Sequence, residues 1–129
     1  MGHGGLEQLD VWRESKEFAR RICAEVVPSL PQDEKYSMAT QLRRSAQSIP
    51  ANIAEAVGRY HYADAVRYCH IARGSLEETL SHLLLGKDLG YIKGSEMSEL
   101  REGYGRVQRL LNGYIAYLRR ERAAQDRRK

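Results

Sequence analysis

Five arginines between residues 43 and 73 are the side chains with the clearest chemical potential in this sequence. They are interspersed with three tyrosines, and the set comprises Arg43, Arg44, Arg59, Arg67 and Arg73 with Tyr60, Tyr62 and Tyr68. A guanidinium group is a planar fork of N–H donors that matches phosphate oxygens, and aromatic rings stack on bases. The pattern therefore predicts a nucleic-acid-binding surface. The alternative is that these arginines form ion pairs with acidic side chains of other helices, within or between subunits.

The end of the chain supplies a second basic segment. Residues 119–129 contain six basic and two acidic side chains, so their net charge of +4 equals that of the whole protein. A basic arm attracts nucleic acid because neutralising phosphates releases condensed counterions. Arg119, Arg120 and Arg122 are therefore further candidates for nucleic-acid contacts. The alternative is a frayed end that only keeps the protein soluble.

Residue types that carry catalysis are present, but their spacing does not predict a catalytic site. Cys69 and His70 are adjacent, so a helix directs them to different faces and a cysteine nucleophile is not expected. His61, His70 and His82 lack a set of cysteine or carboxylate partners at metal-ligand spacing. The sequence contains no glycine-rich phosphate loop and no serine triad. We therefore expect no enzymatic activity, no metal and no cofactor.

Apolar side chains recur at helical spacing along four segments. One stripe has intervals of 3, 4, 3, 4 and 3 residues: Ala39, Leu42, Ala46, Ile49, Ile53 and Ala56. Such patterns predict helices over about residues 9–27, 33–57, 62–89 and 95–121, with flexible ends at 1–6 and 122–129. Helix caps are predicted from short polar residues and glycines, with Asp10 and Asp33 at the starts of the first two helices and Gly58 and Gly90 at the ends of the second and third.

Polar and small residues inside the predicted helices are expected to have structural roles. Pro50 lacks a backbone N–H, so a kink is expected just before it. Asn52 and Glu55 are expected to bond the backbone groups that this proline frees, or Arg59 one turn later. Gly74, in the middle of the third helix, is expected to permit the close approach of a neighbour.

Four amphipathic helices joined by short loops predict an all-α fold. We expect an antiparallel up-down-up-down four-helix bundle that forms a single domain over residues 1–129. The predicted core is Leu42, Ile49, Ile53, Leu76, Leu80, Val107 and Leu111. No apolar run is long enough for a membrane span, and the two cysteines lie within helical patterns. A cytoplasmic location is therefore expected.

Several segments of the chain resemble a known family in order and spacing. They are Leu9–Trp12, Gln41–Arg44, Ser48–Glu55, Gly58–Arg59, Ala72–Glu78 and Leu89–Ile92. Over about residues 6–120 the chain resembles the four-helix bundle proteins encoded in intervening sequences of bacterial 23S ribosomal RNA genes. One departure is Ala56-Val57 before Gly58, where the family commonly has Glu-Gly.

The resemblance carries expectations about assembly and partners. It implies a left-handed bundle, which in this family is commonly a subunit of a pentameric ring. It also implies kinship with the accessory variability determinant proteins of diversity-generating retroelements, which engage a reverse transcriptase and nucleic acid. No settled activity comes with the family, so the resemblance says more about the fold than about function.

Aromatic and aliphatic side chains outnumber the positions of a single bundle seam. Those off the seam include Trp12, Phe18, Tyr36, Tyr68, Ile71, Tyr91 and Tyr117. An isolated bundle would leave some of them as exposed patches, and such patches usually mark interfaces. The sequence therefore predicts a cyclic homo-oligomer, with five subunits suggested by the resemblance alone.

Three functional interpretations follow. The leading one is a non-enzymatic homo-oligomeric bundle that binds RNA, DNA or a nucleoprotein such as a reverse transcriptase through basic surfaces. The alternative is an oligomeric scaffold that binds only protein. A third interpretation is an enzyme, which the lack of a catalytic site in the sequence disfavours. A rival fold is a helix-turn-helix formed by residues 53–60 and a recognition helix at 64–73, but its short helices conflict with the unbroken apolar stripe.

Overall fold

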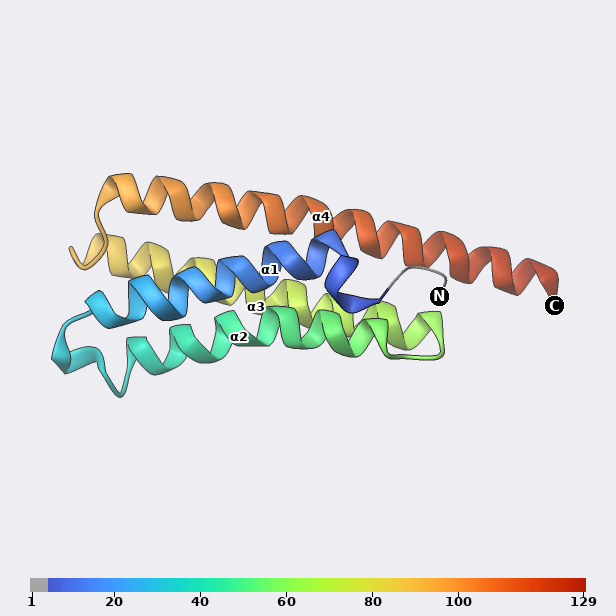
Figure 1. The fold of residues 1–129 in the computed structure, drawn as a ribbon, viewed down its shortest axis with the longest axis horizontal. Coiled ribbons are helices and arrows are strands. Elements are labelled where there is room, and N and C mark those ends of the chain that lie inside the picture. The colour runs from blue at the N-terminus through green and yellow to red at the C-terminus, as the bar shows by residue number, and fades with distance from the viewer. Residues whose placement is uncertain (1–4) are drawn as a thin grey trace.

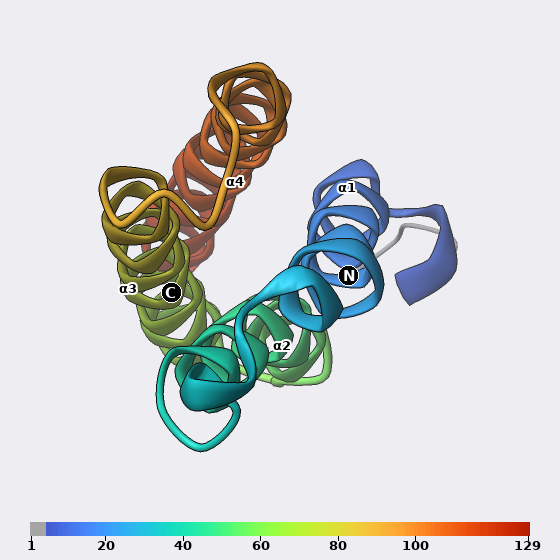
Figure 2. The same cartoon turned by 90° about the vertical axis from the view of Figure 1, so that its left-hand side faces the viewer.

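Four long helices make up most of the structure, a computed structural model that describes residues 5–129. Their bounds are Asp10–Arg21 for α1, Met38–Val57 for α2, Tyr62–Asp88 for α3 and Gly94–Arg128 for α4. Consecutive helices run in alternating directions (Figure 1), and the end-on view shows them arranged around a common interior (Figure 2). No strand occurs within residues 5–129, so the predicted all-α fold with four helices is confirmed.

The core lies along the apolar stripes that the sequence predicted. Leu42, Ile49 and Ile53 of α2 are fully buried. The other four predicted core residues are also buried, namely Leu76, Leu80, Val107 and Leu111. Intervals of 3 and 4 residues return each side chain to the same face of its helix, and burial of that face against the other helices stabilises the bundle.

The segment between α1 and α2 differs from the prediction. α1 continues as a π-helical turn over Ile22–Val26 and a 3₁₀ turn over Val27–Ser29, and another 3₁₀ turn spans Gln32–Glu34. The second helix begins only at Met38, so the prediction that Asp33 caps a helix starting there is wrong. Two prolines in this stretch remove backbone donors and restrict φ, which favours short turns over a continuing helix.

The first two helices begin without the predicted side-chain caps. Asp10 is the first residue of α1 rather than its N-cap, and its carboxylate forms an ion pair with Arg13. At the start of α2, Oε1 of Glu34 accepts the backbone N–H of Met38 at 3.4 Å. An acidic group still lies at each helix start, where it stabilises the positive end of the helix dipole.

Pro50 does not interrupt α2, which continues as one helix from Met38 to Val57. Asn52 donates its side-chain N–H to the backbone carbonyl of Ser48 at 2.8 Å, whereas the carbonyl that the proline leaves free belongs to Ala46. Asn52 therefore braces the turn before it without replacing the lost bond. Glu55 forms the predicted ion pair with Arg59, at 2.7 Å.

The end of α2 matches the sequence prediction. Gly58 is the C-cap, and its N–H donates to the carbonyl of Ala54 at 3.1 Å. Gly90, just after α3, has a φ of 83°, a left-handed conformation that glycine adopts without strain. Because α2 and α3 are long unbroken helices, the helix-turn-helix interpretation of residues 53–73 is wrong.

The close approach predicted at Gly74 occurs at other glycines. A Cβ added at Gly74 would meet no atom within 4 Å, so the prediction is wrong for this chain. A Cβ at Gly103 would instead lie 3.1 Å from the ring of Phe18, and one at Gly86 would lie 3.0 Å from Ile92. The lack of a side chain at Gly103 therefore allows Phe18 of α1 to pack closely. The lack of one at Gly86 does the same for Ile92 of the α3–α4 connection.

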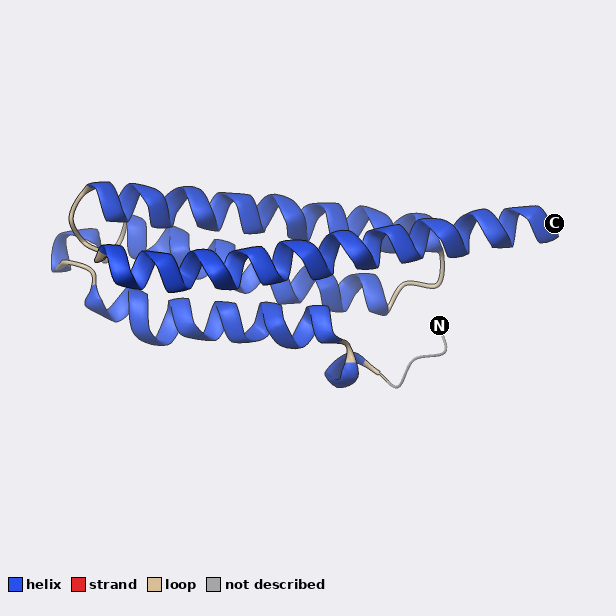
Figure 3. Cartoon of the chain, turned by 90° about the horizontal axis from the view of Figure 1, so that it is seen from above, coloured by secondary structure: helices blue, strands red, loops and turns tan. Residues whose placement is uncertain are grey.

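α4 extends beyond the end predicted for it. The helix continues to Arg128 and projects past the ends of α2 and α3 (Figures 1 and 3), so the prediction that this helix ends at about residue 121 is wrong. Alanine, arginine and glutamine dominate this segment and have high helix propensity, which sustains the helix without tertiary packing. No helix in the described part of the chain combines the length and apolar character that a membrane span requires.

Candidate nucleic-acid interface

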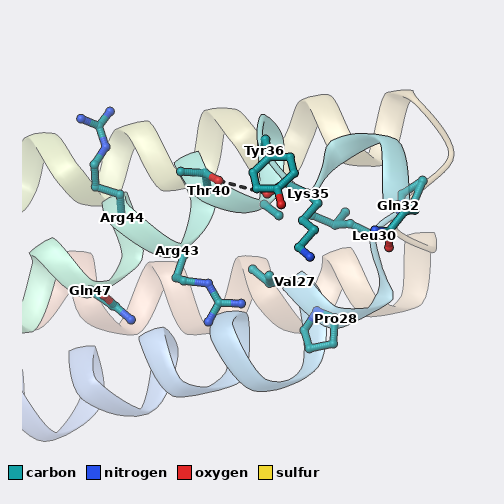
Figure 4. Close-up of a pocket in the computed structure, with 12 residues that line it drawn as sticks. Val27, Pro28, Leu30, Gln32, Lys35, Tyr36, Thr40, Arg43, Arg44 and Gln47 are labelled. Atoms are coloured by element: carbon teal, nitrogen blue, oxygen red, sulfur yellow. Dashed lines mark hydrogen bonds between the residues drawn. The ribbon is translucent and has the colours of Figure 1, made fainter.

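A pocket of about 610 Å³ lies where the end of α1 and the following turns meet the start of α2 (Figure 4). It is lined by apolar, basic, aromatic and neutral polar side chains: Val27, Pro28, Leu30, Pro31, Gln32, Lys35, Tyr36, Ala39, Thr40, Arg43, Arg44 and Gln47. None of these lining residues is acidic. The short turns that precede α2 contribute Val27, Pro28 and Gln32 to this lining.

Two cations converge in the pocket. The ammonium group of Lys35 and the guanidinium of Arg43 both point into it, whereas Arg44 points away (Figure 4). Neither Lys35 nor Arg43 forms an ion pair with any carboxylate of residues 5–129, although ten ion pairs occur elsewhere in that range. Like charges directed into one cavity raise its electrostatic energy, and a bound anion would lower it.

The carboxylate of Glu34, the residue before Lys35, is bound on another side of the loop. Glu34 accepts the hydroxyl of Tyr91 at 3.0 Å, and this hydrogen bond raises the pKa of Tyr91. The carboxylate is therefore directed toward the α3–α4 connection. Arg44, the other arginine of the lining, donates to Gln41 at 2.7 Å and lies 3.8 Å from Glu78 of α3.

Tyr36 gives the pocket an exposed aromatic surface. Its side chain is 86% exposed, which is unusual for a tyrosine in a well-packed helical protein. The ammonium of Lys35 lies 5.5 Å from the ring centroid, within the range of a cation–π contact. A cation beside an open ring is the combination that holds a phosphate next to a stacked base.

Lys35 and Tyr36 were not predicted from the sequence as site residues. Both lie in the turn before α2, and the predicted helix from residue 33 would have placed them on its first turn instead. The available signal was the spacing of Lys35 and Arg43, which lie about two helical turns apart. This spacing alone does not predict a shared site, because it is the turn before α2 that places Lys35 at the pocket.

Arg59 and Arg67 form a separate group around Tyr68 at the α2–α3 connection. Their guanidinium carbons lie 4.5 and 4.6 Å from the ring centroid of Tyr68. Arg59 also donates to Glu55 and to the Tyr68 hydroxyl, and the hydrogen bond to Glu55 raises the pKa of Arg59. The charge of Arg59 is therefore balanced, and the ring of Tyr68 is already in contact with cations.

The remaining predicted arginines belong to α3 and α4. Arg73 and Arg119 both contact His70, at 2.9 and 3.0 Å. Arg120 and Arg122 are exposed on the part of α4 that projects from the bundle. The predicted arginines thus lie in separate groups, and only Arg43 and Arg44 line the α1–α2 pocket.

Comparisons with known proteins agree on one family. The sequence model described as 23S rRNA-intervening sequence protein matches residues 7–113. Among solved structures, the chain is similar to a protein with unknown function from the S23 ribosomal protein family of Bacteroides thetaiotaomicron, at a TM-score of 0.75 and 30% sequence identity over 81% of this chain and 97% of that one. The comparison with curated proteins gives no match. The predicted resemblance is therefore confirmed, and the chain belongs to the 23S rRNA-intervening sequence protein family.

Proposed function

We propose that the protein is a non-enzymatic homo-oligomer that binds the phosphate backbone of RNA or DNA at the pocket between α1 and α2. The observation that carries the proposal is the convergence of Lys35 and Arg43 in a cavity with no acidic lining residue. Phosphate groups supply the missing negative charge, and Tyr36 offers a ring for an adjacent base. Contacts of this kind do not read base edges, so binding is expected to tolerate many sequences.

Assembly would multiply a weak individual contact. Each subunit of a ring contributes one pocket and one projecting α4 with Arg119, Arg120 and Arg122, so several pockets can hold one strand. Linked contacts raise the overall affinity through effective concentration, without any new chemistry. The left-handed twist, the five-subunit ring and a reverse transcriptase partner remain proposals that the family resemblance supports.

The double variant Lys35→Gln plus Arg43→Gln is expected to weaken binding to single-stranded RNA and DNA by about tenfold at low salt. Both changes remove unpaired charge without removing buried surface, so stability is expected to be unchanged. Fluorescence anisotropy across a salt series measures the affinity and its salt slope. For a single strand, the slope is expected to fall by about 1.4 for each subunit that engages the strand.

Arg20→Gln is the matched control for this double variant. Arg20 lies on α1 and is equally exposed, but its guanidinium is held by Glu17 at 2.7 Å and by Glu25 at 3.3 Å. Its removal should leave nucleic-acid affinity nearly unchanged. Equal losses for the control and the double variant would show that net charge rather than the pocket drives binding. Undetectable binding by the intact protein at low salt would reject the proposal in favour of the protein scaffold.

A second candidate function, self-association or protein binding, rests on an exposed apolar cluster at the end of α3. Leu84, Leu85 and Leu89 are 36%, 50% and 50% exposed, and they lie within two helical turns of one another. Neighbouring leucines on a surface usually mark an interface. We infer that this cluster contributes to the contact between copies of the chain.

The double variant Leu85→Glu plus Leu89→Glu is expected to shift the oligomer toward monomer, because the contact would have to bury two carboxylates. Sedimentation velocity at micromolar concentration measures the shift. Arg101→Glu, at an exposed position of α4, serves as the control for added negative charge. An intact protein that already sediments as a monomer would contradict self-association, and an unchanged oligomer in the double variant would place the contact elsewhere.

A further inference from the structure

A group of four polar side chains on α3 and α4 lies apart from the α1–α2 pocket. His70 lies between two guanidinium groups, with Nδ1 at 2.9 Å from Nη2 of Arg73 and Nε2 at 3.0 Å from Nη2 of Arg119. Arg73 also donates to Oδ1 of Asn112 at 3.0 Å. This last bond joins α3 to α4 and holds the Arg73 guanidinium in place.

The hydrogen bonds in this group cannot all be formed at once. A guanidinium only donates, and a neutral imidazole has one acceptor nitrogen and one N–H. His70 can therefore accept from Arg73 or from Arg119, and the other contact brings two donors together. A protonated His70 would accept from neither arginine. The group thus has more donors than acceptors in either protonation state.

Carboxylates do not balance the two arginines. Neither Arg73 nor Arg119 forms an ion pair with a carboxylate in the described chain. Glu77, one turn after Arg73 on α3, accepts the hydroxyl of Tyr104, and Gln108 donates to the same hydroxyl at 3.0 Å. On α4, Glu121 lies two residues beyond Arg119, and its charge acts on Tyr117.

We propose that Arg73, Arg119 and His70 form a binding site for a tetrahedral oxyanion, such as a phosphate group, with His70 as its protonation-dependent ligand. The oxyanion supplies the acceptors that the three side chains lack and offsets their like charges. The site is distinct from the Lys35–Arg43 pocket, which lies between α1 and α2 and shares none of these residues.

The proposal fixes the direction of a pH dependence. In the free protein, burial lowers the pKa of His70, and the charges of Arg73 and Arg119 lower it further. A bound anion stabilises the protonated imidazole and raises that pKa again. Protonation and anion binding therefore favour each other, so affinity is expected to rise as the pH falls. Each unit by which the anion raises the pKa corresponds to about tenfold in affinity between the two protonation states.

Sulfate is the probe for the test, because it remains a dianion across the pH range in which histidine titrates, whereas a phosphate monoester changes charge near about pH 6. Nuclear magnetic resonance of the histidine ring protons in the intact protein follows binding directly. We expect sulfate to shift the His70 signals and raise its pKa, and to bind about tenfold more tightly at about pH 5.5 than at about pH 8. An unmoved His70 signal, or a shift with no change in its pKa, would overturn the proposal.

Matched variants distinguish sulfate binding at the His70 site from non-specific attraction of sulfate to the positive charge of the protein. His70→Asn should remove the pH dependence, whereas His82→Asn should keep it, since His82 lies beside Glu78 at 3.4 Å. Arg73→Gln and Arg119→Gln should each weaken sulfate binding at least threefold (about 0.7 kcal/mol at 25 °C), and the exposed Arg120→Gln should not. Retention of the pH dependence in His70→Asn would refute the assignment.

The same signals distinguish two sources of the phosphate group. A short oligothymidylate that shifts His70 as sulfate does would identify the ligand as a nucleic-acid backbone on this face. A response to inorganic phosphate but not to the oligonucleotide would identify a small phosphorylated ligand. The Lys35→Gln plus Arg43→Gln variant should retain sulfate binding at His70 in either case. A negative result for the Lys35–Arg43 pocket therefore does not reject the His70 site, and a negative result at His70 does not reject the pocket.

Discussion

Leu80→Ala is expected to lower the free energy of unfolding by about 2–5 kcal/mol. Leu80 is buried within the single core cluster that all four helices share. Truncation loses the transfer free energy of the removed atoms and leaves a cavity that the long, mutually braced helices close only in part. Urea denaturation followed by far-UV circular dichroism measures the change.

Leu85→Ala is the control for Leu80→Ala on the same helix. Leu85 lies less than two turns away and is 50% exposed, so its truncation removes much less buried surface. A loss below about 1 kcal/mol is expected when the two variants are compared in the same oligomeric state. Equal losses for both variants would contradict the register of α3 in the bundle.

Thr79→Val is expected to lower the free energy of unfolding by about 1–3 kcal/mol, although valine matches threonine in shape. Thr79 is fully buried, and its hydroxyl lies 2.9 Å from the hydroxyl of Ser45 across the α2–α3 contact. Valine would leave the buried Ser45 hydroxyl with only a 3.4 Å contact to the carbonyl of Leu42. A polar group that loses its partner in a core costs more than the bond contributed.

A double-mutant cycle separates this hydrogen bond from a simple change of volume. Ser45→Ala in the Thr79→Val background removes the hydroxyl that has lost its partner. The double variant should therefore lose about 0.5–3 kcal/mol less of its free energy of unfolding than the sum of the two single losses. Thermal and urea unfolding of the four proteins provide the energies. Additive losses would show that the hydroxyl pair is not coupled.

The hydroxyl pair also shows how two helices achieve a close contact. Ser48 and Ser75 form a second bridge between α2 and α3, with their hydroxyls 2.8 Å apart. Short side chains allow the helices to approach, and one hydrogen bond between the two hydroxyls of each pair joins α2 to α3. This pairing could not be predicted from the sequence, because it depends on the register between two helices.

Several expectations were wrong where local patterns compete with backbone geometry. Asp33 has the residue type of a helix cap, but Pro28 and Pro31 divide the preceding segment into short turns. Gly74 has the residue type of a close-approach site, but it faces open space in the single chain. At the C-terminus, helix propensity up to Arg128 outweighs the loss of the apolar pattern.

The sequence by itself determined the helical architecture and its core. Apolar intervals of 3 and 4 residues identify the buried face of each helix, because the periodicity of a helix is a property of its own backbone. Leu42, Ile49 and Ile53 were therefore predictable as core residues, and the family segments could be recognised along the chain.

Only the tertiary structure decided which charged side chains meet. The turn before α2 brings Lys35 to the same pocket as Arg43 of α2, and the α3–α4 contact brings Arg119 to His70, which lies 49 positions away in the chain. A charge acts through space over a few ångströms, and its partners depend on the register and rotation of helices that the periodicity of any one helix leaves free. The arginines could thus be named from the sequence, but their division into paired and unpaired cations could not.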